Sequence, residues 1–402
     1  MIHNLRFLIP DDLKQRLLYP GYYWSVVKSK FDNRYFSGLE IISAGYKNEF
    51  GGYFNLPIGN KLGDVLFQGT DQTASSWPPK GELAICIRES GATDARTLAY
   101  SRAWNWQQGA FLRWFSEDLL CFNDYDSNTK TYCVKIMDKQ GRLVRQIDSP
   151  LGAIDFSGSV GVSYSFERLA ILREDYGYFA KELSNEREIL TEPIAFSLVD
   201  LNSGGLVHRV SFDDLRDITE VQPENDKVNH FEFSPDGKKV AYLYRYWVDQ
   251  VKITKMMVFD LEKKSHTVIG NEKFYSHFCW IDTEQILVFG QLEEENKFFV
   301  INCVSQKKFI PDFFVPPHDS HPATKTGKRI VFDSYPSFFR KSNILVVDTV
   351  NGTRTSIGRY LHHPTFRGVN RVDHHPRFNQ DERRVYIDLP LGRERKFGVI
   401  QL

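Results

Sequence analysis

Histidine is the residue type with the most uneven distribution in this sequence. Six of the eleven histidines lie in one stretch of the second half: His318, His321, His362, His363, His374 and His375. Two more, His230 and His277, each come just before or within an aromatic-rich run. Because imidazole titrates near neutral pH and is a common metal ligand, such residues could transfer protons or bind a metal ion. Any single histidine could also simply satisfy an internal hydrogen bond.

The segment Asn370-Arg371-Val372-Asp373-His374-His375-Pro376 adds oxygen donors to the histidines. An amide, a carboxylate and imidazoles in so short a run suit Mn²⁺ or another borderline divalent ion better than Ca²⁺. His321 could complete a ligand set made of Asn370, Asp373 and His375. The spacing matches no recognised metal motif, and Arg371 and Asp373 could instead form a structural ion pair.

Arginine, tyrosine and amide side chains supply further candidates. Arginine binds carboxylates through two parallel hydrogen bonds, and tyrosine can act as a general acid or base. The run SRAWNWQQG at 101–109 interleaves two tryptophans with amides, which could orient hydroxyl groups and stack on sugar rings. The tryptophans could equally fill space between structural elements. The candidates of this kind are Arg102, Asn105, Gln107, Gln108, Arg168, Tyr178, Arg245, Tyr246, Tyr335 and Arg371.

Several common kinds of catalytic site lack support. The sequence has no GxSxG, no P-loop, no GxGxxG before a helix and no HExxH, so the usual hydrolase, nucleotide and zinc-protease interpretations are not favoured. The 51 basic and 51 acidic residues balance, which argues against a general electrostatic grip on nucleic acid or on a membrane surface. A local basic pocket for an acidic ligand is compatible with this balance.

The five cysteines are widely spaced and form no CxxC pair, which predicts buried, reduced thiols rather than disulfides or a zinc site. The N-terminus lacks the pattern of a secretory signal, and no run of about 18 apolar residues occurs. These features predict a cytoplasmic protein.

The positions of these candidates depend on the secondary-structure elements that carry them. Most of the elements that the sequence predicts are strands. Short apolar or alternating runs bounded by turn residues predict strands, and aromatic residues make up 14% of the chain. Helices are expected only at 11–18 and, less clearly, at 179–188. The expected strands of the second half lie at 240–246, 330–333, 343–348, 385–388 and 397–402.

A loose repeat indicates how these strands are organised. FSPDGKKVAYL at 233–243, ATKTGKRIVFD at 323–333 and FNQDERRVYID at 378–388 each place a turn and two basic residues before an apolar strand. Repeated small sheets around an axis predict an all-β, seven-bladed β-propeller that spans 1–402 as one domain, with residues 1–30 partly helical. A pair of β-sandwiches or another all-β array is the alternative.

A propeller would bring the chemistry together, because equivalent positions on successive blades converge near the axis. His230, His277, His321 and His375 all lie near predicted strand starts, so we expect them to face one shared hollow.

Taken in order, several segments resemble one family. They are RAWNWQQG, YSFERL and DYGY in the first half, and NHFEFSPDGKK, SHFCW, FDSYP and RVDHHPRF in the second. The chain resembles the seven-bladed propellers related to oligogalacturonate lyase. That family includes lyases acting on uronate oligosaccharides, and proteins loosely labelled glycosyltransferases.

The resemblance implies specific roles. It implies a manganese ion held by late-blade histidines and a glutamine, with another histidine as the base. His375 matches a ligand histidine, His321 is the earlier-blade ligand and His277 is the base. Asp373 stands where the family has histidine, and Asn370 where it has glutamine.

The leading functional prediction is a lyase that cleaves acidic, uronate-containing oligosaccharides by β-elimination. His277 or His230 would be the base, Tyr246 or Tyr335 the acid, and Arg371 or Arg245 the carboxylate clamp. One alternative is a glycoside hydrolase or a polysaccharide-assembly transferase. Another is a propeller that only binds a glycan or a protein.

Overall fold

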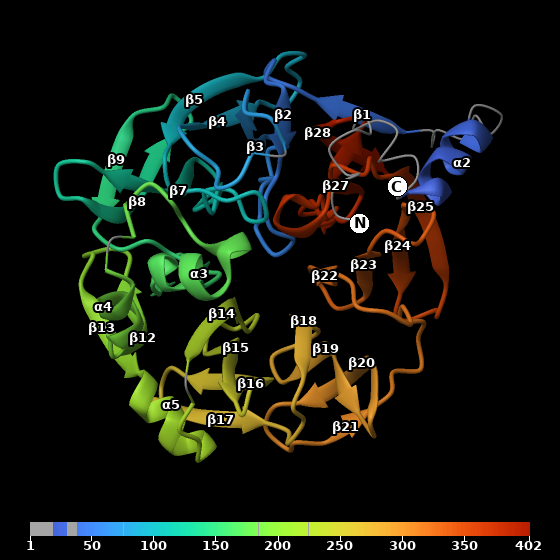
Figure 1. Cartoon of the computed structure of the whole chain (residues 1–402). Helices are drawn as coiled ribbons and strands as arrows, with labels where there is room; N and C mark the ends of the chain where they lie inside the picture. The colour runs from blue at the N-terminus through green and yellow to red at the C-terminus, as the bar shows by residue number, and fades with distance from the viewer. Residues whose placement is uncertain (1–18, 30–37, 75, 184, 224) are drawn as a thin grey trace, which may run out of the picture.

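Seven four-stranded antiparallel sheets stand around one axis, as the blades of a propeller (Figure 1). A computed structural model of the chain describes residues 19–29, 38–74, 76–183, 185–223 and 225–402. In each of the first six blades the strands run from the axis outwards in chain order. The all-β, seven-bladed prediction is therefore confirmed.

The first four blades cover just over half of the chain. Their strands are β2 (Asn48–Phe50), β3 (Val65–Thr70), β4 (Leu83–Arg88) and β5 (Arg96–Ser101) in blade 1; β6 (Arg113–Trp114), β7 (Leu119–Asp126), β8 (Thr131–Asp138) and β9 (Leu143–Ile147) in blade 2; β10 (Ala153–Ile154), β11 (Val160–Ser163), β12 (Ile194–Asp200) and β13 (Leu206–Ser211) in blade 3; and β14 (Asp226–Phe233), β15 (Lys239–Val248), β16 (Val251–Asp260) and β17 (Ser265–Ile269) in blade 4.

The last three blades complete the ring. Their strands are β18 (Tyr275–Trp280), β19 (Gln285–Leu292), β20 (Glu295–Asn302) and β21 (Lys308–Phe309) in blade 5; β22 (Ala323–Thr324), β23 (Arg329–Asp333), β24 (Lys341–Asp348) and β25 (Arg354–Leu361) in blade 6; and β26 (Arg377–Phe378), β27 (Arg384–Leu391), β28 (Glu394–Gln401) and β1 (Leu39–Ile42) in blade 7.

Blade 7 joins the two ends of the described chain. Its three inner strands come from the C-terminal part, and β1 pairs antiparallel with β28 as the outermost strand, with Leu39 opposite Ile400. This pairing covers the edge of the last sheet and ties blade 7 to the chain entering blade 1. The ring is thereby closed through main-chain hydrogen bonds.

The turns between first and second strands have the chemistry that the sequence repeat predicts. In blade 4, Gly237 adopts a φ of 71°, a conformation that side-chain-bearing residues rarely adopt. The Ser234 hydroxyl accepts a hydrogen bond from the amide of Lys239 and donates one to the Asp236 carboxylate. The equivalent repeats form the turns between β22 and β23 and between β26 and β27.

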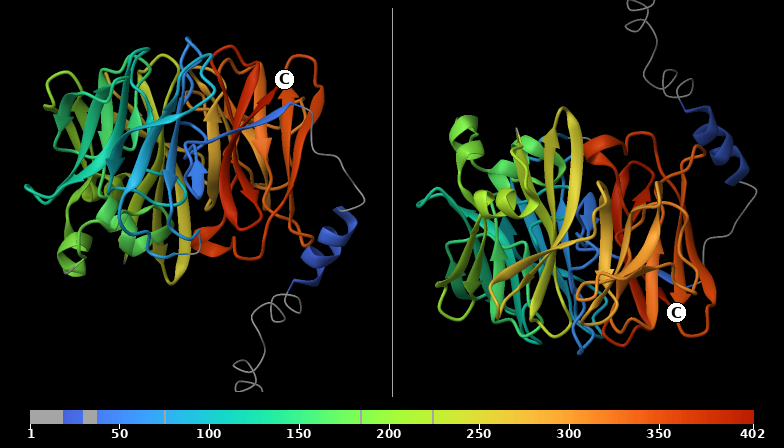
Figure 2. Two further views of the ribbon diagram at one scale, coloured as in Figure 1. Left: turned by 90° about the horizontal axis from the view of Figure 1, so that it is seen from above. Right: turned by 90° about the horizontal axis from the view of Figure 1, so that it is seen from below.

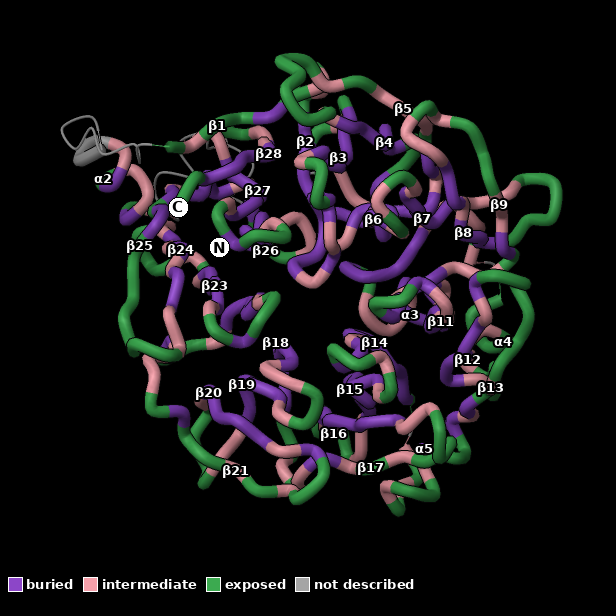
Figure 3. The backbone as a smooth tube through the Cα atoms, turned by 180° about the vertical axis from the view of Figure 1, so that it is seen from behind, coloured by how far each residue is buried: buried purple, intermediate pink, exposed green. Residues whose placement is uncertain are grey.

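Burial follows the distance from the axis (Figure 3). The innermost strand of blade 4, β14, is almost wholly buried, whereas its outermost strand, β17, alternates between exposed and partly buried positions. Apolar side chains of adjacent blades pack against each other, which is where most of the core lies. All five cysteines are buried and unpaired, as predicted.

Helices are few and short. α3 (Phe166–Leu172), η2 (Glu174–Tyr176) and α4 (Glu186–Thr191) lie between β11 and β12, α5 (Phe212–Thr219) follows β13, and η3 (Gly368–Asn370) precedes β26. α2 (Pro20–Ser29) lies outside the ring (Figure 2), where the Ser25 hydroxyl donates to the Phe339 carbonyl at 3.2 Å. Of the two expected helices, 11–18 falls outside the described residues, and the other begins only at Glu186. Neither α3 nor α5 was expected, because each is a short insertion whose start depends on an N-cap. The Ser165 hydroxyl accepts a hydrogen bond from the Arg168 amide, and the Ser211 hydroxyl accepts one from the Asp214 amide.

Candidate functional site

The four predicted histidines meet on the axis, at the end where the innermost strands begin. The ring of His277 lies 4.1 Å from that of His321 and 5.6 Å from that of His230, measured between centroids. His321 lies 4.5 Å from His375. All four side chains are nearly buried. Four blades thus contribute one imidazole each to a single cluster, which we call the histidine end of the axis.

Local irregularities of the strands direct these rings inwards. β14 and β18 each carry a break in register, between Asn229 and Glu232 and between Tyr275 and Phe278, and these breaks contain His230 and His277. His230 and His375 also have left-handed backbones, with φ of 55° and 44°. Such strained positions in side-chain-bearing residues cluster at functional sites.

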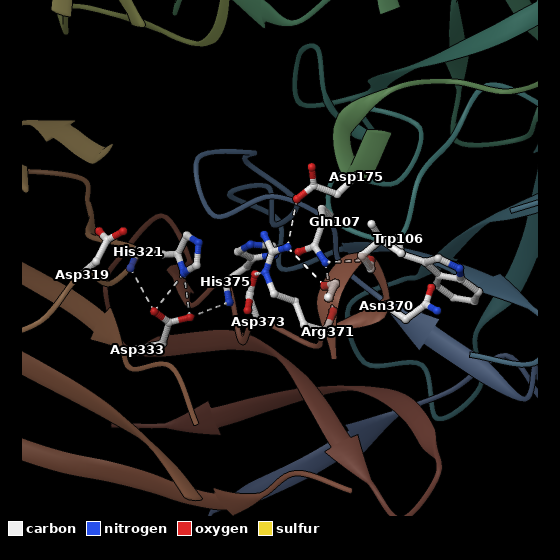
Figure 4. A network of polar contacts seen from close by, with 12 residues as sticks. Trp106, Gln107, Asp175, Asp319, His321, Asp333, Asn370, Arg371, Asp373 and His375 are labelled. Atoms are coloured by element: carbon white, nitrogen blue, oxygen red, sulfur yellow. Dashed lines mark hydrogen bonds and ion pairs between the residues drawn. The ribbon is translucent and has the colours of Figure 1, made fainter. Parts of the chain in front are cut away.

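Three predicted ligands lie close enough to share a metal ion. One donor atom each of His321, Asp373 and His375 lies within 4.8 Å of the others (Figure 4). The Nε2 atoms of His321 and His375 are buried and have no hydrogen-bond partner in the described part of the chain. Two buried imidazole nitrogens without partners beside a carboxylate fit the mixed donor set of a borderline divalent ion.

Asp333 orients His321. Its carboxylate accepts hydrogen bonds from the His321 amide at 2.9 Å and from Nδ1 at 3.0 Å. Burial alone would raise the pKa of Asp333, but the neighbouring His321 outweighs it and holds this pKa well below its usual value. An ionised Asp333 keeps the proton on Nδ1 and leaves the Nε2 lone pair free, which is the usual carboxylate support of a metal-binding histidine.

His277 forms a similar pair with Asp319. Its Nδ1 lies 3.0 Å from Oδ1 of Asp319, whose other oxygen accepts a hydrogen bond from Ser276. Burial lowers the pKa of His277, although Asp319 opposes this effect. The neutral ring, with Nδ1–H donated to Asp319, presents an Nε2 lone pair that can accept a proton.

A segment that follows β2 crosses the axis below the histidines. The Tyr53 hydroxyl lies 2.5 Å from Nδ1 of His230, and the Phe54 ring faces His321 at 5.3 Å between centroids. Arg377 holds this segment by donating to the carbonyls of Gly52 and Tyr53. The floor of the histidine end is therefore Tyr53 and Phe54, which we call the axial plug.

Basic side chains border the cluster on the side of blade 4. Arg245 is buried, and no hydrogen bond or ion pair joins its guanidinium group to the described residues. Burial, then the nearby Arg173, lowers the pKa of Arg245 to about 10. Burial and the neighbouring cations Arg245 and Lys252 lower the pKa of Lys227 to about 6. Among the described residues, Asp175 is the only carboxylate that pairs with the cations Arg173, Lys227, Arg245 and Lys252, through Arg173 at 3.0 Å, so this basic group can accept an anion.

Arg371 is committed to carboxylates of the protein itself. It forms ion pairs with Asp373 at 2.7 Å and with Asp175 at 2.9 Å (Figure 4). It therefore braces a candidate ligand and links blade 7 to the η2 insertion of blade 3. The structural ion pair foreseen for Arg371 and Asp373 is therefore present, and the role of Asp373 as a metal ligand stays a prediction.

The tryptophan–amide run forms a support for Arg371. Asn105 accepts hydrogen bonds from the amides of Gln107 and Gln108, which closes a tight turn. Gln107 donates to the Arg371 carbonyl at 3.0 Å, and Arg395 connects the Trp106 carbonyl to those of Asn370 and Arg371. Gln108 lines a gap of about 10 Å³ beside Tyr53 and His230.

Other predicted residues lie away from the histidines. Arg102 contacts the Tyr125 carbonyl and ring, Arg168 pairs with Asp226, and Tyr178 accepts from Asn123. Tyr246 packs beside Tyr244, whereas the Tyr335 ring lies 5.7 Å from His321. His362 and His374 both contact the Ser342 hydroxyl in a buried network of blade 6 and blade 7.

Sequence reasoning missed Tyr53, Asp319 and the role of Asp333. Asp319 comes two residues before His321, and Asp333 belongs to the FDSYP segment, so spacing and motif offered a signal for both. Tyr53 follows a Gly-Gly pair in the region where the repeat is weakest. Gly52 has a φ of 93°, and a Cβ there would approach the Gln108 carbonyl to 2.7 Å.

Comparison with solved structures reveals the same architecture elsewhere. An oligogalacturonate lyase from Vibrio parahaemolyticus is similar over 90% of this chain and 93% of its own, with a TM-score of 0.60 and 13% identity. An oligogalacturonate lyase in complex with manganese is similar over 92% and 94%, with a TM-score of 0.57 and 13% identity. The likeness to these lyases shows a shared propeller fold.

A propeller from a peptidase shares this fold too. The β-propeller domain of the Trilobed protease from Pyrococcus furiosus has a TM-score of 0.51 and 11% identity, and covers 88% of this chain and 94% of its own. No protein-family model and no curated protein matches the sequence. Among the described residues, no helix is both long and apolar enough to cross a membrane.

Proposed function

We propose that the chain is a metal-assisted lyase that cleaves uronate-containing oligosaccharides by β-elimination. The observation that carries this proposal is the meeting, at one end of the axis, of two imidazole nitrogens without partners and an unpaired buried guanidinium group. The nitrogens belong to His321 and His375, and the guanidinium group to Arg245. Elimination beside a carboxylate needs a base and positive charge at that carboxylate.

The metal ion of the proposal fits the donors present. His321, Asp373 and His375 would hold it, and the Nδ1 contact with Asp333 already orients His321 for that role. Asn370 is a weaker ligand candidate, since its backbone is tied through Arg395 towards the Trp106 support. When bound, a divalent ion neutralises a coordinated carboxylate and makes the neighbouring carbon acid stronger.

His277 is the base in this proposal. Its Nε2 takes the proton from C5 of the uronate, the C–H electrons form the C4–C5 double bond, and the C4–O4 bond breaks. Asp319 acts as a positioning residue, because its contact with Nδ1 fixes the tautomer that leaves Nε2 free. His230 is less suited, because the Tyr53 hydroxyl can donate to its Nδ1, and the ring proton then lies on Nε2, which has no free lone pair to act as a base.

Tyr335 donates the proton that the leaving oxygen needs. Desolvation of its hydroxyl by the surrounding residues and the nearby Asp373 and Asp319 hold its pKa well above the usual value, so it stays protonated at neutral pH. The side chain is partly exposed and its ring lies beside His321, which leaves it accessible to a ligand over the histidines. Arg245 receives the uronate carboxylate or that of the adjoining sugar unit.

The test is incubation with a panel of uronate oligosaccharides and Mn²⁺, followed by ultraviolet absorbance and product mass. Elimination yields an unsaturated uronate whose fragment masses sum to that of the substrate, whereas hydrolysis adds one water. Exposed His318 provides the matched control: His318→Ala retains activity and His277→Ala loses it. A folded, metal-loaded protein that cleaves no member of the panel, or that gives saturated products, contradicts the proposal.

A further inference from the structure

A roomy cavity lies at the opposite end of the axis from the histidines. It has a volume of about 480 Å³, within the range of small-molecule sites. Its walls come from the ends of innermost strands and from the segments that follow them, for example Trp114 at the end of β6, Trp280 at the end of β18 and Lys325 after β22. None of the four clustered histidines lines it.

The axial plug separates this cavity from the histidine end. Phe54 contributes to the cavity wall on one side and contacts the rings of His277, His321 and His375 on the other. The two ends of the axis are therefore distinct sites that share one side chain.

The cavity walls are rich in aromatic rings. They include Phe54, Phe111, Trp114, Phe156, Trp280 and Phe378. The Phe156 side chain, at the rim, is 68% exposed, although apolar rings of this size are usually buried. Such surfaces bind flat apolar rings by stacking and edge contacts.

Two cations on these walls have no carboxylate partner in the described part of the chain. The Arg113 guanidinium group donates only to the backbone carbonyls of Trp114 and Ile154, both at 3.2 Å. No hydrogen bond or ion pair joins the Lys325 ammonium group to the described residues. By contrast, Lys61 pairs with Glu117, and Arg377 with Asp388.

The one remaining acid on the walls carries little charge at neutral pH. Burial raises the pKa of Glu232 to about 8. Lys325 is exposed as a whole residue, but desolvation by the cavity walls and the nearby Arg113 lower its pKa to about 8, so the ammonium form still contributes at pH 7. Below pH 8 the cavity thus has two unpaired cations against a mostly neutral carboxyl group.

We propose that this cavity is a second binding site, for a small acid that carries its carboxylate on a flat apolar ring. The ring stacks among the aromatic walls, and the carboxylate pairs with Lys325 and Arg113. A sugar acid fits less well, because the side-chain amides that could bind its hydroxyl groups already form hydrogen bonds. Asn55 donates to the Phe231 carbonyl, and Asn60 donates to the Asp64 carboxylate. This inference does not depend on the proposed lyase activity.

Binding should weaken as the pH rises through about 8. There Glu232 gains negative charge and Lys325 loses positive charge, and both changes oppose an anionic ligand. Glu232→Gln removes one of the two causes and should reduce the loss. The other charged groups that face these residues are Lys61, Arg113, Glu117, Asp155, Arg377 and Glu382.

The experiment is calorimetric titration of the full chain with 2-naphthoate at pH 7. We expect one molecule to bind, at least about tenfold more tightly than uncharged 2-naphthylmethanol, because a charged hydrogen bond contributes about 1.5–3 kcal/mol. Lys325→Met should weaken binding by about tenfold or more, whereas Lys307→Met, at an exposed position of blade 5, should leave it unchanged. His277→Ala should also leave it unchanged, which separates this site from the lyase proposal.

Three results would overturn the inference: no binding of 2-naphthoate to the wild-type protein, equal binding of the alcohol, or unchanged affinity in Lys325→Met. Galacturonate binding that is tighter than that of 2-naphthoate and is weakened by Lys325→Met would also overturn it, since the cavity would then select a hydroxylated ring. Circular dichroism of each variant confirms that the propeller is intact.

Discussion

The two ends of the propeller axis differ in how their charges are organised. At the histidine end, carboxylates hold the imidazole rings in place through Nδ1: Asp333 orients His321, and Asp319 orients His277. At the cavity end, Arg113 donates to backbone carbonyls, Lys325 has no partner among the described residues, and aromatic rings make much of the walls. A site that holds side chains in one tautomer is suited to chemistry, whereas a roomy, aromatic and cationic site is suited to binding.

The largest expected effect is on turnover at the histidine end. His277→Ala should reduce kcat on uronate oligosaccharides by about 10²–10⁴-fold, because it removes the general base. Steady-state rates of unsaturated product measure this effect, and His318→Ala serves as the control. Retention of more than about a tenth of wild-type kcat would remove His277 from the reaction.

The next effect tests the support of the metal ligands. Asp333→Asn should weaken Mn²⁺ binding by about 10–100-fold, because the amide no longer holds the proton on Nδ1 of His321. Calorimetric titration with Mn²⁺ gives the affinity, and thermal melting without metal checks that the variant folds. Unchanged affinity would mean that His321 is not oriented by this carboxylate for binding a metal ion.

The basic group beside the histidines provides a prediction on stability. Lys227→Met should raise the free energy of unfolding by about 2 kcal/mol at pH 6, because burial of the ammonium group is costly. The pKa of Lys227 is about 6 in the folded protein and 10.5 when unfolded, so the folded state binds fewer protons between these values. The stability of the wild type rises with pH there, and the gain from the substitution should shrink towards pH 10.5.

Urea unfolding of Lys227→Met and of the wild type at pH 6, 8 and 10 measures this difference. A gain that stays constant with pH would show that Lys227 is not a buried cation. Loss of stability at pH 6 would show that its contacts with the Leu172 carbonyl and the Trp247 ring outweigh the burial of charge.

The smallest effect concerns the tryptophan–amide run. Gln107→Ala should cost about 1 kcal/mol of stability, the usual net value of a hydrogen bond, and lower kcat/KM only a few-fold. A fall in kcat/KM comparable to that of His277→Ala would indicate that Gln107 contacts substrate directly. Thermal melting and kinetics of the same preparation separate the two roles.

The histidine end could be predicted from the sequence better than the cavity end. Turns such as Pro235-Asp236-Gly237 mark where the first strand of a blade ends, and a propeller brings equivalent first strands together, so the meeting of His277 and His321 followed from topology. The roles of Gln107 and Arg168 could not follow, because burial and partners are settled only when blades pack. Glu232 and Lys325 occupy ordinary turn and strand positions, and only the closed ring places them around one cavity.

The position of the axial plug was the hardest feature to predict from the sequence. Tyr53 occurs outside any repeat, and its position depends on carbonyl contacts with Arg377, more than three hundred residues later in the chain. Long-range contacts of this kind leave no local pattern in the sequence.

The most direct test of the account is a crystal of the wild-type protein grown with Mn²⁺, with diffraction recorded at the manganese absorption edge. The account predicts one strong anomalous peak within bonding distance of His321, Asp373 and His375. The absence of a peak there at saturating Mn²⁺, or a peak bound by other residues instead, would contradict it.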